Sequence, residues 1–353
     1  MTHHHATVAI IGWWFAWLSA YWTIKRASPQ TSIVLFDMRD HFTWIPWLHE
    51  TLGRGKALAN LQISLRKNLW SDYHAEHITH IQKHEITTAS GKTWTFDFCV
   101  IATWSRTNFF GKTDFEQHAV TLRYPEDVLL INKKLSTAHH VTVVGGGFTG
   151  IEIASMLGAR KLVKGTLRLI HGKERLADRM EPAVSRLCKK RLEQRGVEVM
   201  LDQKVTTITP TEVHLESGAI LASDLTILSS GIKINDESFR DYLNFAGEYA
   251  SHESPDIFWC GDVAIHGLYT TAHNAMCEGK RVGRIIADRL LGITRTYPPL
   301  TNRDKLAIAL WPYDGVMTIG TKTYYLPRVT GFLKKLVQRK VMREFKTGRM
   351  LPF

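Results

Sequence analysis

Short apolar runs alternate with helical stretches along this chain of 353 residues. The runs are rich in Val and Ile, which is typical of buried strands in a parallel sheet. The alternation predicts an α/β fold in which helices cover parallel sheets. The clearest strand candidates lie at Val8–Ile11 and Val141–Val144 and within residues 31–40 and 166–173.

The first strand is followed by the outline of a nucleotide-binding turn. Gly12 opens the turn, and Asp37, which ends the next strand, lies 25 residues further on. An acid near this distance typically binds the ribose hydroxyls of a dinucleotide. A phosphate-binding loop has the pattern Gly-x-Gly-x-x-Gly, because the later glycines let the backbone approach pyrophosphate and pack helix on strand. Here Trp14 and Trp17 occupy the second and third glycine positions.

A second unit, at residues 139–157, has the complete pattern. Gly145, Gly147 and Gly150 follow the strand Val141–Val144, a helix is expected from about Ile151, and the closing strand at 166–173 arrives at the spacing of a βαβ unit. The segments VAIIGWWFAWLSA and VTVVGGGFTGIEIA align without gaps. This internal repeat indicates that the first turn belongs to the same motif.

With these motifs, the chain resembles the two-dinucleotide flavoproteins and, among them, the type II NADH dehydrogenases (NADH:quinone oxidoreductases). Further segments agree in order: 96–105 resembles the strand closing the first flavin segment, 224–235 its counterpart in the nicotinamide domain, 256–264 the second flavin motif, and 271–283 the helix facing the flavin ring.

The resemblance implies two Rossmann-like domains, one binding FAD and one, inserted into it, binding NAD(P)H. The expected divisions are a flavin domain at 1–120 and 237–305, a nicotinamide domain at 121–236, and a basic C-terminal region at 306–353. The cofactor-binding residues expected from it are Gly12, Trp14, Trp17, Asp37, Ala102, Thr103, Gly261 and Asp262 for FAD, and Gly145, Gly147, Gly150 and Gly231 for NAD(P)H.

The implied reaction passes hydride from NAD(P)H to FAD and electrons on to a membrane quinone. The resemblance places Glu152 near the contact of nicotinamide and flavin, while an ordinary first-turn Glu is the plainer alternative. His273 is a candidate proton donor to quinone, although the helix lacks the family's two glutamines. A quinone pocket is expected at Pro46, His49, Ala272 and Met276.

The choice between NADH and NADPH stays open in the sequence. The closing strand of the second unit ends in His171, Gly172 and Lys173, with Arg175 beyond, and basic residues here accommodate a 2′-phosphate. Glu174 is an alternative ribose ligand, which would favour NADH.

Net charge is +12, and the last 53 residues carry eleven basic side chains against three acidic ones. At 331–346 the apolar residues Leu333, Leu336, Val337, Val341 and Phe345 share a helical face flanked by Lys and Arg. We expect this helix to hold the protein at the cytoplasmic face of a membrane, or else to pack on the protein's own surface. No motif for nucleic acid accompanies the charge, and a homodimer is left open.

The four cysteines, Cys99, Cys188, Cys260 and Cys277, are scattered, so no metal site is expected. A sulfide:quinone oxidoreductase shares the implied architecture and depends on paired cysteines. Cys260 and Cys277 lie in flavin-facing segments, which keeps that enzyme as an alternative.

The tryptophans of the first turn allow three interpretations. They can fill the pyrophosphate site, which would make the chain a flavin-free sensor that binds only NAD(P)H. The apolar run 8–22 can be a membrane anchor whose motif is accidental. Alternatively, Trp13, Trp14, Trp17 and Trp104, with Trp47, stand for glycine codons, since some bacteria read UGA as glycine. We favour the third hypothesis, because one residue type replaces glycine at each place.

Overall fold

The computed structural model describes residues 3–12, 15–65, 72–103, 105–234, 245–246, 249–251, 254–264, 270–300, 305–310, 314–319, 322–325 and 329–347. Trp13, Trp14 and Trp104 lie outside these residues.

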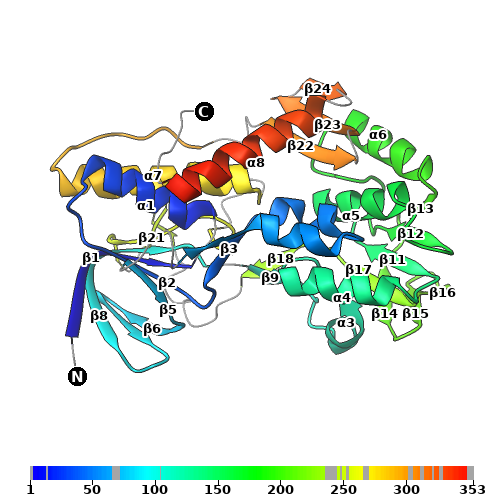
Figure 1. Ribbon diagram of the computed structural model, residues 1–353, viewed down its shortest axis with the longest axis horizontal. Coiled ribbons are helices and arrows are strands. Elements are labelled where there is room, and N and C mark those ends of the chain that lie inside the picture. The colour runs from blue at the N-terminus through cyan, green and yellow to red at the C-terminus, as the bar shows by residue number, and fades with distance from the viewer. Residues whose placement is uncertain are drawn as a thin grey trace.

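The larger sheet combines strands from both ends of the first 260 residues (Figure 1). Its order is β19-β20-β21-β8-β1-β2-β5, and the β6–β7 hairpin pairs with β8. Strand β1 lies between β8 and β2 and is parallel to both. The strands are β1 (His3–Ile11), β2 (Ile33–Asp37), β5 (Tyr73–Ala75), β6 (Ile78–Gln82), β7 (Glu85–Thr88), β8 (Thr93–Ile101), β19 (Phe245–Ala246), β20 (Ala250–Ser251) and β21 (Ile257–Trp259).

Two long helices, α1 (Phe15–Ala27) and α7 (Ala272–Leu290), lie side by side over one face of this sheet (Figure 1). Their backbones touch, because a Cβ atom at Gly279 would lie 1.9 Å from the carbonyl oxygen of Ala16. Glycine on α7 is therefore what allows the two helices to approach so closely.

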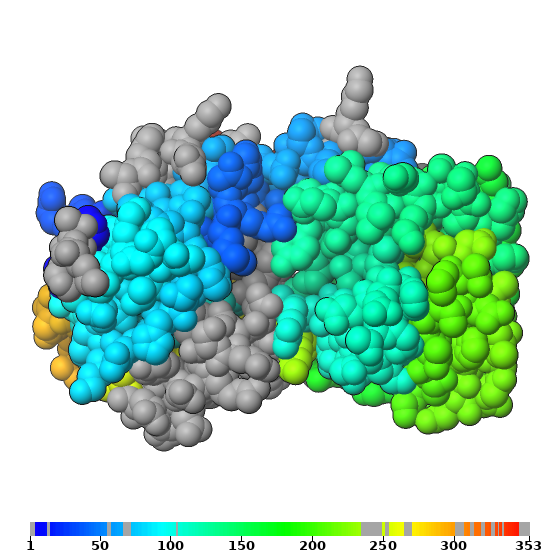
Figure 2. All heavy atoms as spheres, turned by 90° about the horizontal axis from the view of Figure 1, so that it is seen from below, coloured from blue at the N-terminus to red at the C-terminus, as the bar shows by residue number. Residues whose placement is uncertain are grey.

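The second sheet is a smaller, parallel one of order β10-β17-β11-β12-β13. Helix α5 (Phe148–Ala159) follows β11, and α6 (Pro182–Glu193) lies between β12 and β13. In Figure 2 the strands β6–β8 and the second sheet belong to two separate lobes. The strands are β10 (Ala119–Val120), β11 (Val141–Val144), β12 (Leu167–Ile170), β13 (Val197–Met200) and β17 (Leu225–Leu228).

Shorter elements complete and connect the two sheets. Strand β9 (Ser105–Thr107) pairs with β18 (Ile232–Ile234), so the segments that follow β8 and β17 run together. The remaining elements are β3 (His41–Thr43), η1 (Ile45–Thr51), η2 (Gly55–Leu61), β4 (Gln62–Ser64), α3 (Thr113–His118), α4 (Pro125–Leu135), β14 (Val205–Ile208), β15 (Glu212–Leu215) and β16 (Ile220–Ala222).

The C-terminal residues return to the N-terminal helix. Strands β22 (Lys305–Leu310), β23 (Asp314–Ile319) and β24 (Lys322–Tyr325) form an antiparallel sheet, and α8 (Val329–Thr347) runs from it to α1 (Figure 1). There the rings of Phe345 and Phe42 lie 4.5 Å apart, centroid to centroid. The apolar core therefore joins segments from both ends of the chain.

The structure confirms the α/β class with two Rossmann-like sheets. Helix α5 begins at Phe148, one turn before the expected start near Ile151. The membrane-anchor interpretation of residues 8–22 is wrong, because Val8–Ile11 form a central buried strand and α1 packs in the core. In the described part of the chain, no helix has the length and apolarity needed to cross a membrane.

Candidate functional site

The two strand–turn–helix units share one hydrogen-bond frame. The N–H of Gly12 donates to Phe36 O at 2.8 Å, and the N–H of Gly145 donates to Ile170 O at 2.8 Å. On the other side, Ala102 N donates to Ile11 O at 2.8 Å, and Ser229 N donates to Val144 O at 2.7 Å. The sequence repeat is therefore also a repeat of structure, with Gly12 opposite Gly145 and Ala102 opposite Ser229.

The first glycine of each unit is required by its backbone. Gly12 has φ +97° and Gly145 has φ +114°. A Cβ atom would lie 2.4 Å from Ala102 O in the first unit and 2.2 Å from Ser229 O in the second. Only glycine combines this backbone conformation with such a close neighbouring strand.

The second unit forms an open cradle at the N-terminus of α5. A Cβ atom at Gly147 would meet nothing within 4 Å, whereas one at Gly150 would lie 1.9 Å from Gly145 O. Gly231, with φ +98°, also borders open space. The free backbone N–H groups of a helix N-terminus suit an anionic group, so a pyrophosphate fits here.

Asp37 lies at the carboxyl end of β2, where Rossmann folds bind the ribose. Its carboxylate accepts the N–H of Arg39 at 2.8 Å. Burial raises the pKa of Asp37 to about 7, against the lowering effect of Arg39. An open cleft of about 420 Å³ begins beside it and is lined by Met38, Arg39, Asp40, His41, Thr43, Gln62, Ala75 and Glu126.

Asp262 belongs to a polar network that the sequence alone did not suggest. The Ser105 hydroxyl donates to Asp262 Oδ2 at 3.1 Å, and Arg123 Nη2 donates to Ser105 Oγ at 2.9 Å. Burial raises the pKa of Asp262, while the Arg123 charge and the Ser105 hydrogen bond lower it. The network fixes the carboxylate beside Gly261, at the end of β21.

Glu278 holds the Gly261 loop against α7. Its buried carboxylate accepts the N–H of Gly261 at 2.6 Å. Burial raises the pKa of Glu278 to about 8, the Asp262 charge adds to the rise, and the Gly261 hydrogen bond opposes it. The folded protein therefore keeps a proton that the unfolded chain loses near pH 4.5.

Because of this raised pKa, we expect the free energy of unfolding to fall as pH rises from 4.5 to 8. Glu278→Gln keeps an acceptor for Gly261 and removes the titration, so the slope should flatten by up to about 1.4 kcal/mol per pH unit. Urea unfolding of both proteins across this range measures it. The exposed Glu216→Gln is the control and should leave the slope unchanged; parallel curves for Glu278→Gln and the parent would contradict the assignment.

Glu152 and His49 form a buried pair between the two sheets. Oε2 of Glu152, on α5, lies 3.5 Å from Nδ1 of His49, on η1. Oε1 accepts the N–H of Ala309 on β22 at 2.9 Å. Both residues are less than a tenth exposed. The sequence singled out each residue for a different role, and the structure brings them together.

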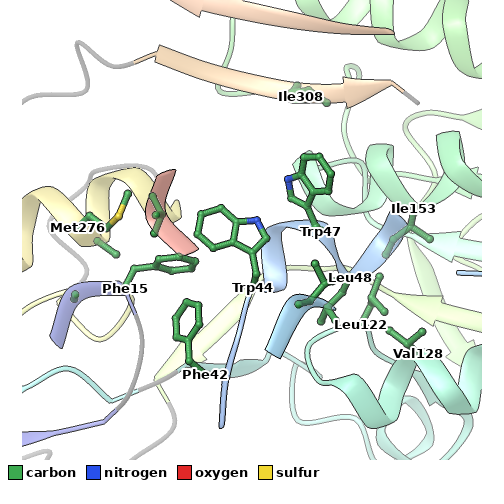
Figure 3. Packing of buried hydrophobic residues seen from close by; sticks show 14 of the residues in the cluster. Phe15, Phe42, Trp44, Trp47, Leu48, Leu122, Val128, Ile153, Met276 and Ile308 are labelled. Carbon is green, nitrogen blue, oxygen red and sulfur yellow. The ribbon is translucent and has the colours of Figure 1, made fainter. Parts of the chain in front are cut away.

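The residues expected at a quinone pocket lie on two elements. Pro46 is half-buried on η1, and Ala272 and Met276 lie on the first turns of α7. His273, also on α7, is half-buried, with Nε2 3.7 Å from the Cys277 sulfur. Figure 3 shows Trp44 and Trp47 between Met276 of α7 and Ile153 of α5, and all four residues belong to one apolar cluster.

The sequence profile of the pyridine nucleotide-disulphide oxidoreductases matches residues 6–279. The chain belongs to this family. Ferroptosis suppressor protein 1 of Xenopus tropicalis is 26% identical over 324 residues, 83% of each chain. Apoptosis-inducing factor homolog A of Dictyostelium discoideum is 24% identical over 286 residues, 69% of this chain and 68% of that protein.

Solved structures of the same fold include two enzymes. The sulfide:quinone oxidoreductase from Aquifex aeolicus superposes with a TM-score of 0.84 at 16% identity, over 99% of this chain and 93% of that one. NDH2 from Plasmodium falciparum in complex with NADH gives 0.80 at 14% identity, over 95% and 94%. At these identities the likeness concerns the fold.

Pyridine nucleotide-disulphide oxidoreductases use FAD and NAD(P)H, and most of the first unit fits FAD. Gly12, Asp37 and Asp262 stand at the expected strand ends. Ala102 is buried beside Gly12, and the buried Thr103 hydroxyl finds no hydrogen-bond partner in the described part of the chain. A hydroxyl at this position suits a polar ligand.

One described position of the first unit does not fit this cofactor. Trp17 stands where the third motif glycine allows close helix–strand packing, and its side chain is only 1% exposed. Trp14, the other expected cofactor contact in this loop, lies outside the described residues.

The sequence missed Ser105, Arg123 and Glu278. Ser105 begins the short strand β9 and Arg123 lies in the connection before α4, and neither has motif spacing to Asp262. Glu278 could have been noticed as an acid on the apolar side of α7. In the described residues, no group of three or more His, Cys, Asp or Glu side chains is arranged to hold a metal ion.

Proposed function

We propose that this flavoprotein oxidises NAD(P)H and passes the electrons through FAD to a membrane quinone. The observation that carries the proposal is the buried Glu152–His49 pair, which joins the nicotinamide-binding helix to the segment expected beside the quinone. NDH2, solved in complex with NADH, and a sulfide:quinone oxidoreductase have the same fold, which supports a nucleotide and a quinone as the two substrates.

FAD, when bound, supplies the two-electron chemistry that links the two substrates. The protein's part is to position them. The α5 N-terminus and the open space at Gly147 bind the pyrophosphate of NAD(P)H. Asp37 binds the adenosine ribose of FAD and Asp262 its ribityl chain. Glu152 orients the nicotinamide, and His49, whose Nδ1 lies 3.5 Å from Oε2, keeps the Glu152 carboxyl group in place.

The choice of donor depends on His171. The shared hydrogen-bond frame puts His171 opposite Asp37, at the place of the ribose-binding acid. Its Nδ1 accepts the N–H of Gly146 at 3.1 Å, while Lys173 pairs with Asp178 at 2.5 Å. Because a histidine and not an acid stands opposite Asp37, and Glu174 lies three residues further on beside Arg175, we propose that NADPH is accepted as well as NADH.

Turnover with defined substrates tests the function. The FAD-loaded protein should reduce a short-chain ubiquinone with NADH or NADPH, and sulfide should not replace the nucleotide. Cys260 is fully buried, and burial raises its pKa well above the usual value, which disfavours the thiolate that sulfide chemistry needs. Quinone reduction by sulfide alone would overturn the proposal in favour of a sulfide:quinone oxidoreductase.

We further propose that α8 binds the membrane surface with its first half. Phe332, Leu333, Leu336 and Val337 are each more than a third exposed. The expected apolar face is divided, because Val341 and Phe345, in the second half, are buried against the core. The exposed half therefore offers a short apolar patch beside exposed basic residues such as Arg339.

Leu333→Glu/Leu336→Glu should lower binding to vesicles at least tenfold, because it places two acids in the apolar patch. Cosedimentation with vesicles of phosphatidylglycerol and phosphatidylcholine measures this. Leu129→Glu/Leu130→Glu, an apolar pair on α4 that is at least as exposed, is the matched control and should bind like the parent. Equal losses in both variants, or none, would contradict the role of α8.

A further inference from the structure

The shared hydrogen-bond frame sets an exact register between the two units of this chain. Gly12 stands opposite Gly145, and Ala102 stands opposite Ser229, because each pair makes the same backbone hydrogen bonds. Counting on from these anchors needs no gap. Positions 13, 14, 17 and 104 then fall opposite Gly146, Gly147, Gly150 and Gly231.

All four of these positions are tryptophan in the first unit. Between them, Phe15 stands opposite the identical Phe148, and the small Ala16 stands opposite Thr149. A site that had lost its ligand would collect several residue types at its former glycines. Replacement of glycine alone, always by tryptophan, points to one cause acting on one codon.

Position 17 corresponds to a place in the second unit that has no room for a side chain. At its counterpart Gly150 even one added carbon would lie 1.9 Å from a carbonyl oxygen. Trp17 is buried, and its Nε1–H has no hydrogen-bond partner in the described residues. The same holds for the Nε1–H groups of Trp22, Trp44, Trp47 and Trp94. The missing hydrogen bond therefore does not distinguish position 17, whereas the close contact at Gly150 does.

The remainder of the first unit keeps the features of a nucleotide site. Gly12 retains φ +97°, Asp37 ends β2, and the Asp262 carboxylate is held by Ser105. Thr103 presents a buried hydroxyl at the same strand end. These groups border the turn. Of its replaced glycine positions the structure describes position 17, which a buried indole occupies.

We infer that residues 13, 14, 17 and 104 are glycine in the protein that its own cells make. Their codon is UGA, which these cells read as glycine and which a different code table translates as tryptophan. The first turn is then Gly-Gly-Gly-Phe-Ala-Gly, a pyrophosphate seat equivalent to that of the second unit. The inference rests on the internal repeat and does not depend on the proposed electron acceptor.

The direct test reads the gene and the protein together. The four codons should be UGA, and mass spectrometry of the protein purified from its own cells should find glycine at all four positions. UGG at any of these codons, or a peptide carrying tryptophan there, would overturn the inference, whatever activity the protein has.

A recombinant pair supplies a second readout, the FAD content of the purified protein. The fourfold variant Trp13→Gly/Trp14→Gly/Trp17→Gly/Trp104→Gly should retain at least tenfold more FAD than the protein with tryptophan at these positions. Trp22→Gly, on the same helix but outside the turn, is the control and should not restore binding. Equal FAD content in the tryptophan-containing protein and the fourfold variant would contradict the inference.

Discussion

Gly150→Ala should lower the free energy of unfolding by about 3 kcal/mol and abolish NAD(P)H binding. The added methyl would lie 1.9 Å from Gly145 O, and the obstacle is backbone that a side-chain rotation cannot clear. Helix α5 must therefore move away from β11, which disturbs the cradle at its N-terminus. Urea unfolding and nucleotide titration measure the two effects.

Gly147→Ala is the matched control for this prediction. Position 147 has φ −76° and ψ −176°, which any residue adopts, and the new methyl meets nothing within 4 Å. Stability should therefore stay unchanged, while the Kd for NAD(P)H rises about tenfold or more, because the methyl occupies the place of the pyrophosphate. Equal destabilisation by both substitutions would show that the cradle is not open as described.

Glu152→Gln should slow the reduction of the flavin by NAD(P)H about 100-fold, the size of effect typical of a positioned carboxylate. The amide can still accept the N–H of Ala309, so the fold should keep its melting temperature. What it loses is the charge that faces His49, 3.5 Å away. Anaerobic stopped-flow measurement of the rate constant, across a range of pH, gives both its size and its pH profile.

His49→Gln separates positioning from a structural effect at Glu152. Because the two side chains form one buried pair, their substitutions should be far from additive, and the double variant should be little slower than Glu152→Gln alone. Additive losses would mean that the residues act independently. An unchanged rate constant in Glu152→Gln would show that the Glu152 carboxylate does not contribute to hydride transfer.

The local sequence pattern was enough to predict the main strands, the two glycine turns and the position of Asp37 at the end of a strand. Glycine spacing and apolar runs are features of short stretches of chain. The domain assignments and the roles of the site residues stay predictions. The contacts that support the site could not be read in this way. Ser105 donates to Asp262 across more than 100 residues of chain, and Arg123 acts on that pair through Ser105. Nothing in the sequence around either residue signals such a partner.

The C-terminal helix α8 shows a second reason why the sequence did not predict every contact. Periodicity correctly placed Leu333, Leu336, Val337, Val341 and Phe345 on α8. It could not tell which of them would be covered, because that depends on Phe42 and other residues near the N-terminus. A helical face predicts burial in general, and the tertiary partner decides whether protein or membrane provides it.

Anaerobic titration of the protein purified from its own cells tests the central claim most directly. We expect an absorbance band at about 450 nm that is bleached by one equivalent of NADH or NADPH and restored by one equivalent of a short-chain ubiquinone. A colourless protein, or a band that the nucleotide bleaches but quinone does not restore, would contradict it.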